Sequence, residues 1–166
     1  MAHPMVDQLR FTRSEWRRAL RGTPPVDGLR RLEPMNSIGW IVGHLAWQEQ
    51  RYFLTRGQGL TPIPLLNEIA ASGGPATTPP LAEMLAAWRK ITRAVDPWLD
   101  SLTRESMLEP LGGGGPWRTT GDPIQRVTYH YWFHIGEILA IRQMLGHRRL
   151  PEYVGDLEGR APYRSA

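Results

Sequence analysis

The chain has 166 residues, with 20 basic and 16 acidic side chains and no cysteine. This length is enough for one domain with its own hydrophobic core, and the lack of cysteine excludes thiolate catalysis and thiolate metal ligands. We therefore expect a single domain over residues 1–166, with a core at about 5–146 and a polar tail at 147–166.

The net charge is +4, and almost all of the positive charge comes from arginine, because Lys90 is the only lysine. The basic residues are scattered, whereas a nucleic-acid-binding surface needs a concentrated patch and a recognisable motif. No apolar run reaches the roughly 18 residues of a membrane span, and the N-terminus lacks the apolar core of a signal peptide. We therefore expect a cytoplasmic protein with no nucleic-acid or membrane partner, and the arginine-rich composition indicates a GC-rich bacterium.

Two stretches in the first third of the chain have apolar residues at helical spacing. The first predicts a helix over 6–20, ended by Gly22 and the prolines that follow it, before an irregular connection with a short turn at 29–32. The second predicts a helix from a cap at Asn36 or Ser37 to about Thr55. Its glycines predict close packing of a neighbouring backbone. Its expected inner stripe is Ile38, Ile41, Val42, Leu45, Gln48 and Tyr52.

The next helix is expected only after a long, proline-rich loop over 56–78. A connection of that length lets the following helix run parallel to the one before it. Leucine, tryptophan, isoleucine and valine recur at helical spacing over 81–102, and Pro97 should kink or interrupt that helix near its end. A second loop is expected over 103–121. Its glycine run, 112–115, lacks the lysine of a phosphate-binding loop.

The stretch 122–146 predicts the longest helix of the chain. Asp122 suits an N-cap, Pro123 the first helical position, Gln125 a capping-box partner and Gly146 a left-handed C-cap. Four helices with two long connections predict an all-α fold, an antiparallel four-helix bundle of crossover type. The expected inner stripe is Val127, Tyr131, His134, Ile138, Ile141 and Leu145.

Three histidines fall on or beside these predicted inner faces. His130 and His134 are one helical turn apart, which puts both imidazoles on one side of the last helix. His44 borders the inner stripe of the second helix and would complete a set of three nitrogen ligands, as in catalytic zinc sites. Histidines that are hydrogen-bonded in the core are the other interpretation, and spacing alone does not separate the two.

The segments NSIGWIVGHLAWQEQ and YHYWFHIGEILAIRQMLGH resemble the two signature helices of the DinB-like (YfiT-like) metalloenzyme superfamily. The resemblance covers about residues 5–146. It implies an up-down-down-up four-helix bundle with a long crossover between helices two and three. By position it implies that His44, His130 and His134 are the metal ligands. The family often has glutamine where this chain has Glu137, so Glu137 is either a partner of a ligand or an acid that faces the metal.

The resemblance also implies a chemistry. Related proteins include mycothiol-dependent isomerases and bacillithiol S-transferases, so the expected cofactors are a divalent metal (zinc or nickel, with iron as a further option) and a low-molecular-weight thiol. A small-molecule substrate and a homodimer are expected in the same way. The alternative function is a non-catalytic module that binds metal or acts in stress responses through dimerisation.

Other residues near the predicted ligands are weaker candidates for the site. Gln48 is one turn beyond His44 and can orient an imidazole or a water, or lie at the rim of the bundle. Tyr131 and Arg142 can approach the pocket, although a surface position is the simpler expectation for the arginine. Disorder is expected at His3, and His147 is expected to favour the helix C-terminus through its charge. Core or dimer contacts are expected of the tryptophans Trp40, Trp47, Trp88 and Trp132.

Overall fold

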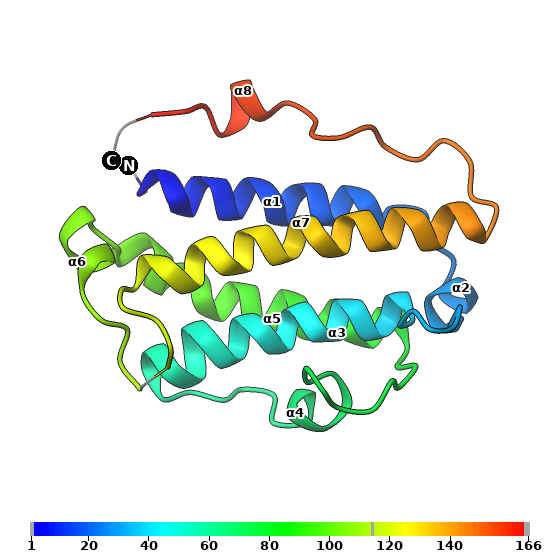
Figure 1. Cartoon of the computed structure of the whole chain (residues 1–166), viewed down its shortest axis with the longest axis horizontal. Helices are drawn as coiled ribbons and strands as arrows, with labels where there is room; N and C mark the ends of the chain where they lie inside the picture. Colours follow the sequence, from blue (N-terminus) through cyan, green and yellow to red (C-terminus); the bar gives the residue numbers. More distant parts are fainter. Residues whose placement is uncertain (1, 114, 165–166) are drawn as a thin grey trace. The chain divides into compact units, whose positions relative to one another are not determined.

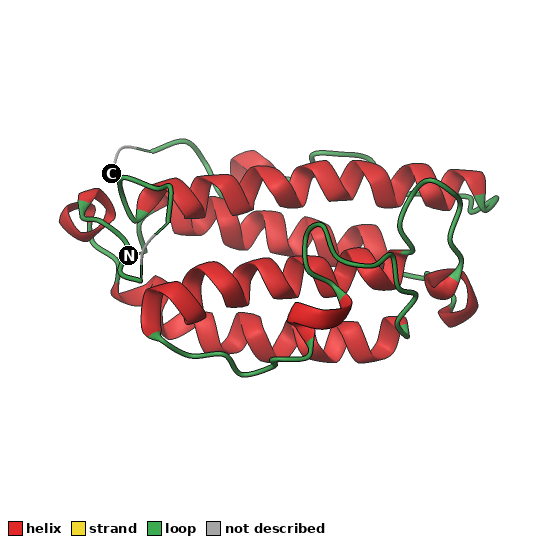
Figure 2. Ribbon diagram, turned by 60° about the horizontal axis from the view of Figure 1, so that its bottom comes forward, coloured by secondary structure: helices red, strands yellow, loops and turns green. Residues whose placement is uncertain are grey.

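The structure is a computed structural model that describes residues 2–113 and 115–164; Gly114, within the glycine run, lies outside the described residues. Every regular element in those ranges is a helix, as Figure 2 shows, so the predicted all-α class is confirmed. Within the same ranges, none of the helices is long and apolar enough to cross a membrane. The chain forms two compact units, one of residues 1–21 with 98–166 and the other of residues 22–97.

In the first unit, α1 (Pro4–Leu20) and α7 (Gly121–Met144) pack side by side and run in the same direction (Figure 1). The ring of Phe11 on α1 lies 6.3 Å from that of Trp132, and Ala19, eight residues later, accepts a hydrogen bond from Arg142 of α7. This parallel pair agrees with the up-down-down-up order, in which the first and fourth helices share a direction.

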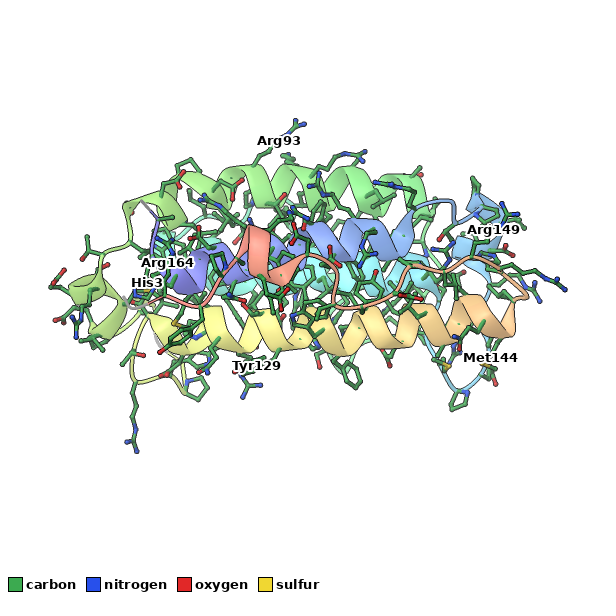
Figure 3. The ribbon with its side chains drawn as sticks, turned by 90° about the horizontal axis from the view of Figure 1, so that it is seen from above. His3, Arg93, Tyr129, Met144, Arg149 and Arg164 are labelled. Carbon is green, nitrogen blue, oxygen red and sulfur yellow. The ribbon has the colours of Figure 1, made fainter. Side chains whose placement is uncertain are left out.

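The N-terminus of α1 differs from the expectation of disorder. His3 is the N-cap residue, and its Nδ1 accepts a hydrogen bond from the backbone N–H of Met5 at 3.2 Å. This bond satisfies one of the donors that every helix start leaves free. The side chain of Arg164 reaches the carbonyl of Ala2 at 2.9 Å (both His3 and Arg164 are labelled in Figure 3).

The start of α7 corrects the predicted capping box. The N-cap is Thr120, and Asp122 lies inside the first turn, where its Oδ2 accepts the backbone N–H groups of Arg118 (2.9 Å) and Thr119 (3.0 Å). These bonds hold the pKa of Asp122 below its ordinary value. Gln125 donates instead to the hydroxyl of Tyr129, so the predicted capping-box contact of its side chain is replaced by this one.

The C-terminal segment is packed against α1 rather than left as a polar tail. The hydroxyl of Tyr153 donates to the carbonyl of Glu15 at 3.1 Å, and the ring packs edge-on against Trp132 at 6.0 Å. Ala161, just after the short helix α8 (Leu157–Arg160), is buried and accepts a hydrogen bond from Gln8. The sequence did not indicate this packing, because several of the contacts are hydrogen bonds to backbone carbonyls.

One short helix also interrupts the loop predicted over 103–121. This is α6 (Arg104–Leu108), which a capping box between Thr103 and Ser106 starts. Met107 is buried, so the loop contributes to the core of the first unit.

The second unit contains α2 (Pro25–Leu29), α3 (Ile38–Glu49), the π-helical turn η1 (Gln50–Arg56), α4 (Leu66–Ile69) and α5 (Leu81–Ser101) up to Pro97. The helix α2 occupies the connection expected to be irregular, and α4 lies in the loop expected to lack structure. Their brevity explains the misses, since four or five residues show no periodicity.

Within this unit α3 and α5 run parallel, as the long connection between them predicted (Figure 1). The two glycines of α3 mark their contact. A Cβ on Gly39 would lie 2.1 Å from the carbonyl oxygen of Pro79, and one on Gly43 would lie 2.7 Å from Sδ of Met84. The close approach predicted from these glycines is therefore confirmed.

The π-helical turn η1 changes which residues are buried. An α-helical continuation of α3 would place Tyr52 inward, two turns after Leu45. In η1 the wider turn adds one residue, so Phe53 and Leu54 are fully buried and Tyr52 is half-exposed. Tyr52, which was expected on the inner stripe, is therefore only half-buried.

Pro97 does not interrupt α5, which continues for four more residues to Ser101. Proline removes only one backbone donor, and Leu99 beyond it is fully buried. The apolar packing of that last turn offsets the missing hydrogen bond.

Candidate metal centre

The site is built on α7, where the His-x3-His spacing places two imidazoles on one side of the helix. The Nε2 atoms of His130 and His134 lie 3.0 Å apart, and the ring centroids are 4.4 Å apart. His134 is buried and His130 is half-buried. Two ring nitrogens this close share either a proton or a cation, and 3.0 Å is within the span of two zinc–nitrogen bonds of about 2.0–2.1 Å.

A carboxylate holds the other side of the His134 ring. Oε2 of Glu137, one turn further along α7, lies 2.5 Å from Nδ1 of His134. An ionised carboxylate only accepts hydrogen bonds, so it holds the hydrogen on Nδ1 and leaves the lone pair on Nε2. Glu137 therefore contacts the ligand candidate through the nitrogen that faces away from His130.

In the second unit, His44 is buried on α3 in a comparable arrangement. Its Nδ1 lies 2.9 Å from the carbonyl oxygen of Ala70, directly after α4. Trp40 and Trp47 stack on the ring, with centroids at 4.7 Å and 5.3 Å and interplanar angles of 10° and 25°. The carbonyl fixes the lone pair on Nε2, and the stacked indoles fix the plane of the ring.

The tryptophans are themselves held in place. The indole N–H of Trp40 donates to the carbonyl of Pro75 at 3.2 Å, and that of Trp47 donates to Asn67 at 3.0 Å. Trp40 lies four residues before His44 and Trp47 three after it, so helical spacing puts all three on one face. This spacing could have indicated from the sequence that two tryptophans stack on the histidine. The prediction assigned the tryptophans only to core or dimer contacts.

The remaining candidate residues, Gln48, Tyr131 and Arg142, are all buried. Gln48 is buried on α3, and Tyr131 is fully buried with its ring packed edge-on against Trp16 at 5.6 Å. Arg142 is only 5% exposed, which contradicts the expected surface position, and burial lowers its pKa. Its guanidinium donates to the carbonyl of Ala19, near the C-terminus of α1.

The expectation for His147 is also corrected. Its Nδ1 accepts a hydrogen bond from Nε of Arg142 at 3.0 Å, so this nitrogen acts as an acceptor rather than as part of a cation. Gly146 has a φ of +80°, and its left-handed conformation turns the chain so that the N–H of His147 reaches the carbonyl of Arg142. The left-handed glycine predicted to close this helix is confirmed, and it directly follows the C-cap residue, Leu145.

Comparison with known proteins gives a family. The family model described as the DinB superfamily matches residues 8–138, which include most of α1, all of α3 and α5, and the histidine pair of α7. No curated protein sequence matches the chain. The imidazoles of His130 and His134, which lie together on α7, are compatible with a metal site, because each offers one ring nitrogen. From the extent of the match, the chain belongs to the DinB superfamily.

Proposed function

We propose that the protein binds one divalent metal ion through His44, His130 and His134 and uses it to activate a small-molecule nucleophile. The observation that carries this proposal is the pair of Nε2 atoms 3.0 Å apart on α7. A close imidazole pair with one buried ring is costly unless something binds it, and a cation is the ligand that two lone pairs favour.

The surroundings of the histidines support the same proposal. The acceptors at Nδ1 of His134 and of His44 each favour the tautomer whose lone pair is on Nε2, which is the arrangement common to histidine ligands of metals. All donors would be neutral imidazoles, a set that suits zinc, nickel and iron. With three protein ligands, a coordination position stays open for an exogenous molecule.

The chemistry that the bound ion would supply is Lewis acidity, which lowers the pKa of a coordinated water or thiol towards neutrality. The chain has no cysteine, so any thiol must come from a cofactor. We propose a low-molecular-weight thiol, such as mycothiol or bacillithiol, and hence an S-transferase or isomerase reaction in the cytoplasm of a bacterium. The resemblance to thiol-dependent members of the superfamily supports this part.

The direct test is elemental analysis of the purified protein, followed by titration with Zn²⁺ and Ni²⁺. The wild type should bind one ion per chain, and His134→Ala should lose that ion. His3→Asn is a matched control, because it also removes an imidazole but keeps an acceptor for the N-cap of α1. Wild-type protein without metal affinity would refute the proposal, and so would retention of the ion by His134→Ala.

A second candidate function is a non-catalytic module that acts as a homodimer. The specific observation in its favour is an apolar strip on α7, where Tyr129, Phe133 and Met144 are 64%, 60% and 67% exposed. Helical spacing puts all three on one side of the helix, and Figure 3 labels the first and last of them. Apolar surface of this kind marks contact sites.

Two measurements separate the candidates. Thiol-transfer assays with mycothiol and bacillithiol on the metal-loaded protein test the enzyme, with His134→Ala as the inactive reference. Light scattering gives the mass in solution, and Met144→Glu should halve it if the strip holds a dimer together. A metal-loaded dimer that leaves both thiols unreacted favours the non-catalytic module.

A further inference from the structure

Glu137 is an ionisable side chain in contact with His134, the buried histidine of α7. The side chain of His134 is 7% exposed and that of Glu137 is 33% exposed, so the carboxylate closes the solvent side of a buried ring. Their spacing of three residues on one helix makes the contact geometrically natural. Glu137 lies near the end of the segment that matches the family model, residues 8–138.

The contact engages the ring at the nitrogen that the proposed ion does not use. The two nitrogens of an imidazole point in divergent directions. A carboxylate held 2.5 Å from Nδ1 is therefore directed away from the region between the Nε2 atoms of His130 and His134. This geometry favours a role through the histidine over direct metal coordination.

The equivalent acceptor on His44 differs in charge. There a neutral backbone carbonyl, that of Ala70, lies 2.9 Å from Nδ1. Both acceptors fix the same tautomer, but only the carboxylate makes a charge-assisted hydrogen bond to the ring and adds a negative charge near the site. Orientation of a histidine thus does not require an acid, and the charge at Glu137 has a further effect.

We propose that Glu137 is a positioning residue that holds Nε2 of His134 towards the metal, strengthens metal binding and weakens the binding of anions to the bound metal. The proposal rests on the proposed function for the identity of the ion. A carboxylate behind a ligand offsets part of the charge of a divalent cation held by neutral imidazoles. The bound metal then attracts an anionic ligand less strongly than it would with glutamine at the same position.

The test compares Glu137→Gln and Glu137→Ala with the wild type, with Glu83→Ala as a control that removes an exposed carboxylate from α5. Zn²⁺ affinity is measured by competition with a chelator. Glu137→Ala should bind Zn²⁺ about 10–100-fold more weakly, the range for loss of such a partner. Glu137→Gln should fall between, since its amide oxygen still accepts the hydrogen bond, and Glu83→Ala should equal the wild type.

The effect on anions needs a separate readout that a merely structural role would not change. Azide is titrated into the Co²⁺-loaded proteins and followed by visible absorption. Both Glu137 variants should bind azide more tightly than the wild type. Unchanged Zn²⁺ and azide affinities in both variants would overturn the proposal. So would a loss of Zn²⁺ in Glu137→Gln as complete as that in His134→Ala, because it would make Glu137 a direct ligand.

A third readout keeps this inference distinct from the proposed function. Nitrogen-15 NMR of the metal-free protein reports which nitrogen of His134 carries the hydrogen. The wild type should show it on Nδ1, and Glu137→Ala should lose that preference. Wild type with the Nδ1 tautomer but no Zn²⁺ affinity refutes the proposed function and the metal part of this inference, while the positioning role stands. Hydrogen on Nε2 in the wild type overturns the positioning role itself.

Discussion

Gly39 and Gly136 offer the same substitution, glycine to alanine inside a helix, with opposite expected results. A Cβ on Gly39 would lie 2.1 Å from the carbonyl oxygen of Pro79, whereas one on Gly136 would meet nothing within 4 Å. Relief of the first contact requires α3 and the backbone at Pro79 to move apart by about 0.9 Å, and packed interiors resist such shifts. Gly136→Ala needs no movement at all.

The magnitudes follow from two opposing effects. Alanine stabilises a helix by up to about 1 kcal/mol relative to glycine, and overpacking costs about 1–3 kcal/mol. The obstacle at Gly39 is backbone rather than the end of a flexible side chain, so we take the upper value and expect a net loss of about 2 kcal/mol. Gly136→Ala should gain about 1 kcal/mol.

Calorimetry and urea unfolding measure both changes. At about 2–4 °C per kcal/mol for a chain of this size, Gly39→Ala should lower Tm by about 4–8 °C, and Gly136→Ala should raise it by about 2–4 °C. If Gly39→Ala were as stable as the wild type, the close approach of α3 to Pro79 would be refuted. A similar loss of stability in both variants would mean that the space around each glycine does not decide whether alanine stabilises or destabilises the protein.

Three further predictions concern the first unit. Arg142→Met should lower the free energy of unfolding by about 1–3 kcal/mol, because the buried carbonyl of Ala19 loses its donor, and urea unfolding measures this loss. Burial raises the pKa of Tyr153 to about 12, so the contribution of this phenol to stability is complete below its ordinary pKa of 10.0 and is lost between about pH 10 and 12. An absorbance titration of the wild type against Tyr153→Phe should show one phenol that ionises late. Ionisation of this phenol near pH 10 would contradict the burial. Two backbone donors lower the pKa of Asp122, so its contribution to stability is present above its ordinary pKa of 3.8 and is lost as the pH falls through the lower pKa of the folded state. Asp122→Asn should therefore be less stable than the wild type at pH 7 but not at pH 2. Urea unfolding midpoints at the two pH values would show this difference.

The long helices could be predicted because their periodicity extends over many turns. The first helix was expected over 6–20 and is Pro4–Leu20, and the closing Gly146 was identified by the need for a left-handed residue. Features that depend on a single inserted residue or on four-residue segments left no such signal. The π-helical turn η1 is of the first kind, and α4 is of the second.

The candidate site was predictable as residues but not as an arrangement. His130 and His134 were identified by spacing, and their 3.0 Å separation agrees with it. The role of Glu137 stayed open, because a sequence does not show which nitrogen of a histidine a carboxylate contacts. The partner of His44 was not predictable either, since a backbone carbonyl such as that of Ala70 carries no residue identity.

The indole–imidazole–indole stack on α3 has an optical consequence. The rings of Trp40 and Trp47 both stack on the ring of His44, at centroid distances of 4.7 Å and 5.3 Å. The emission of an indole depends on the electronic state of a ring stacked on it, so whatever changes the imidazole of His44 should change the fluorescence of these two tryptophans. The protein thus carries a built-in reporter for one of its three candidate ligands, and binding at that ring can be followed without any label.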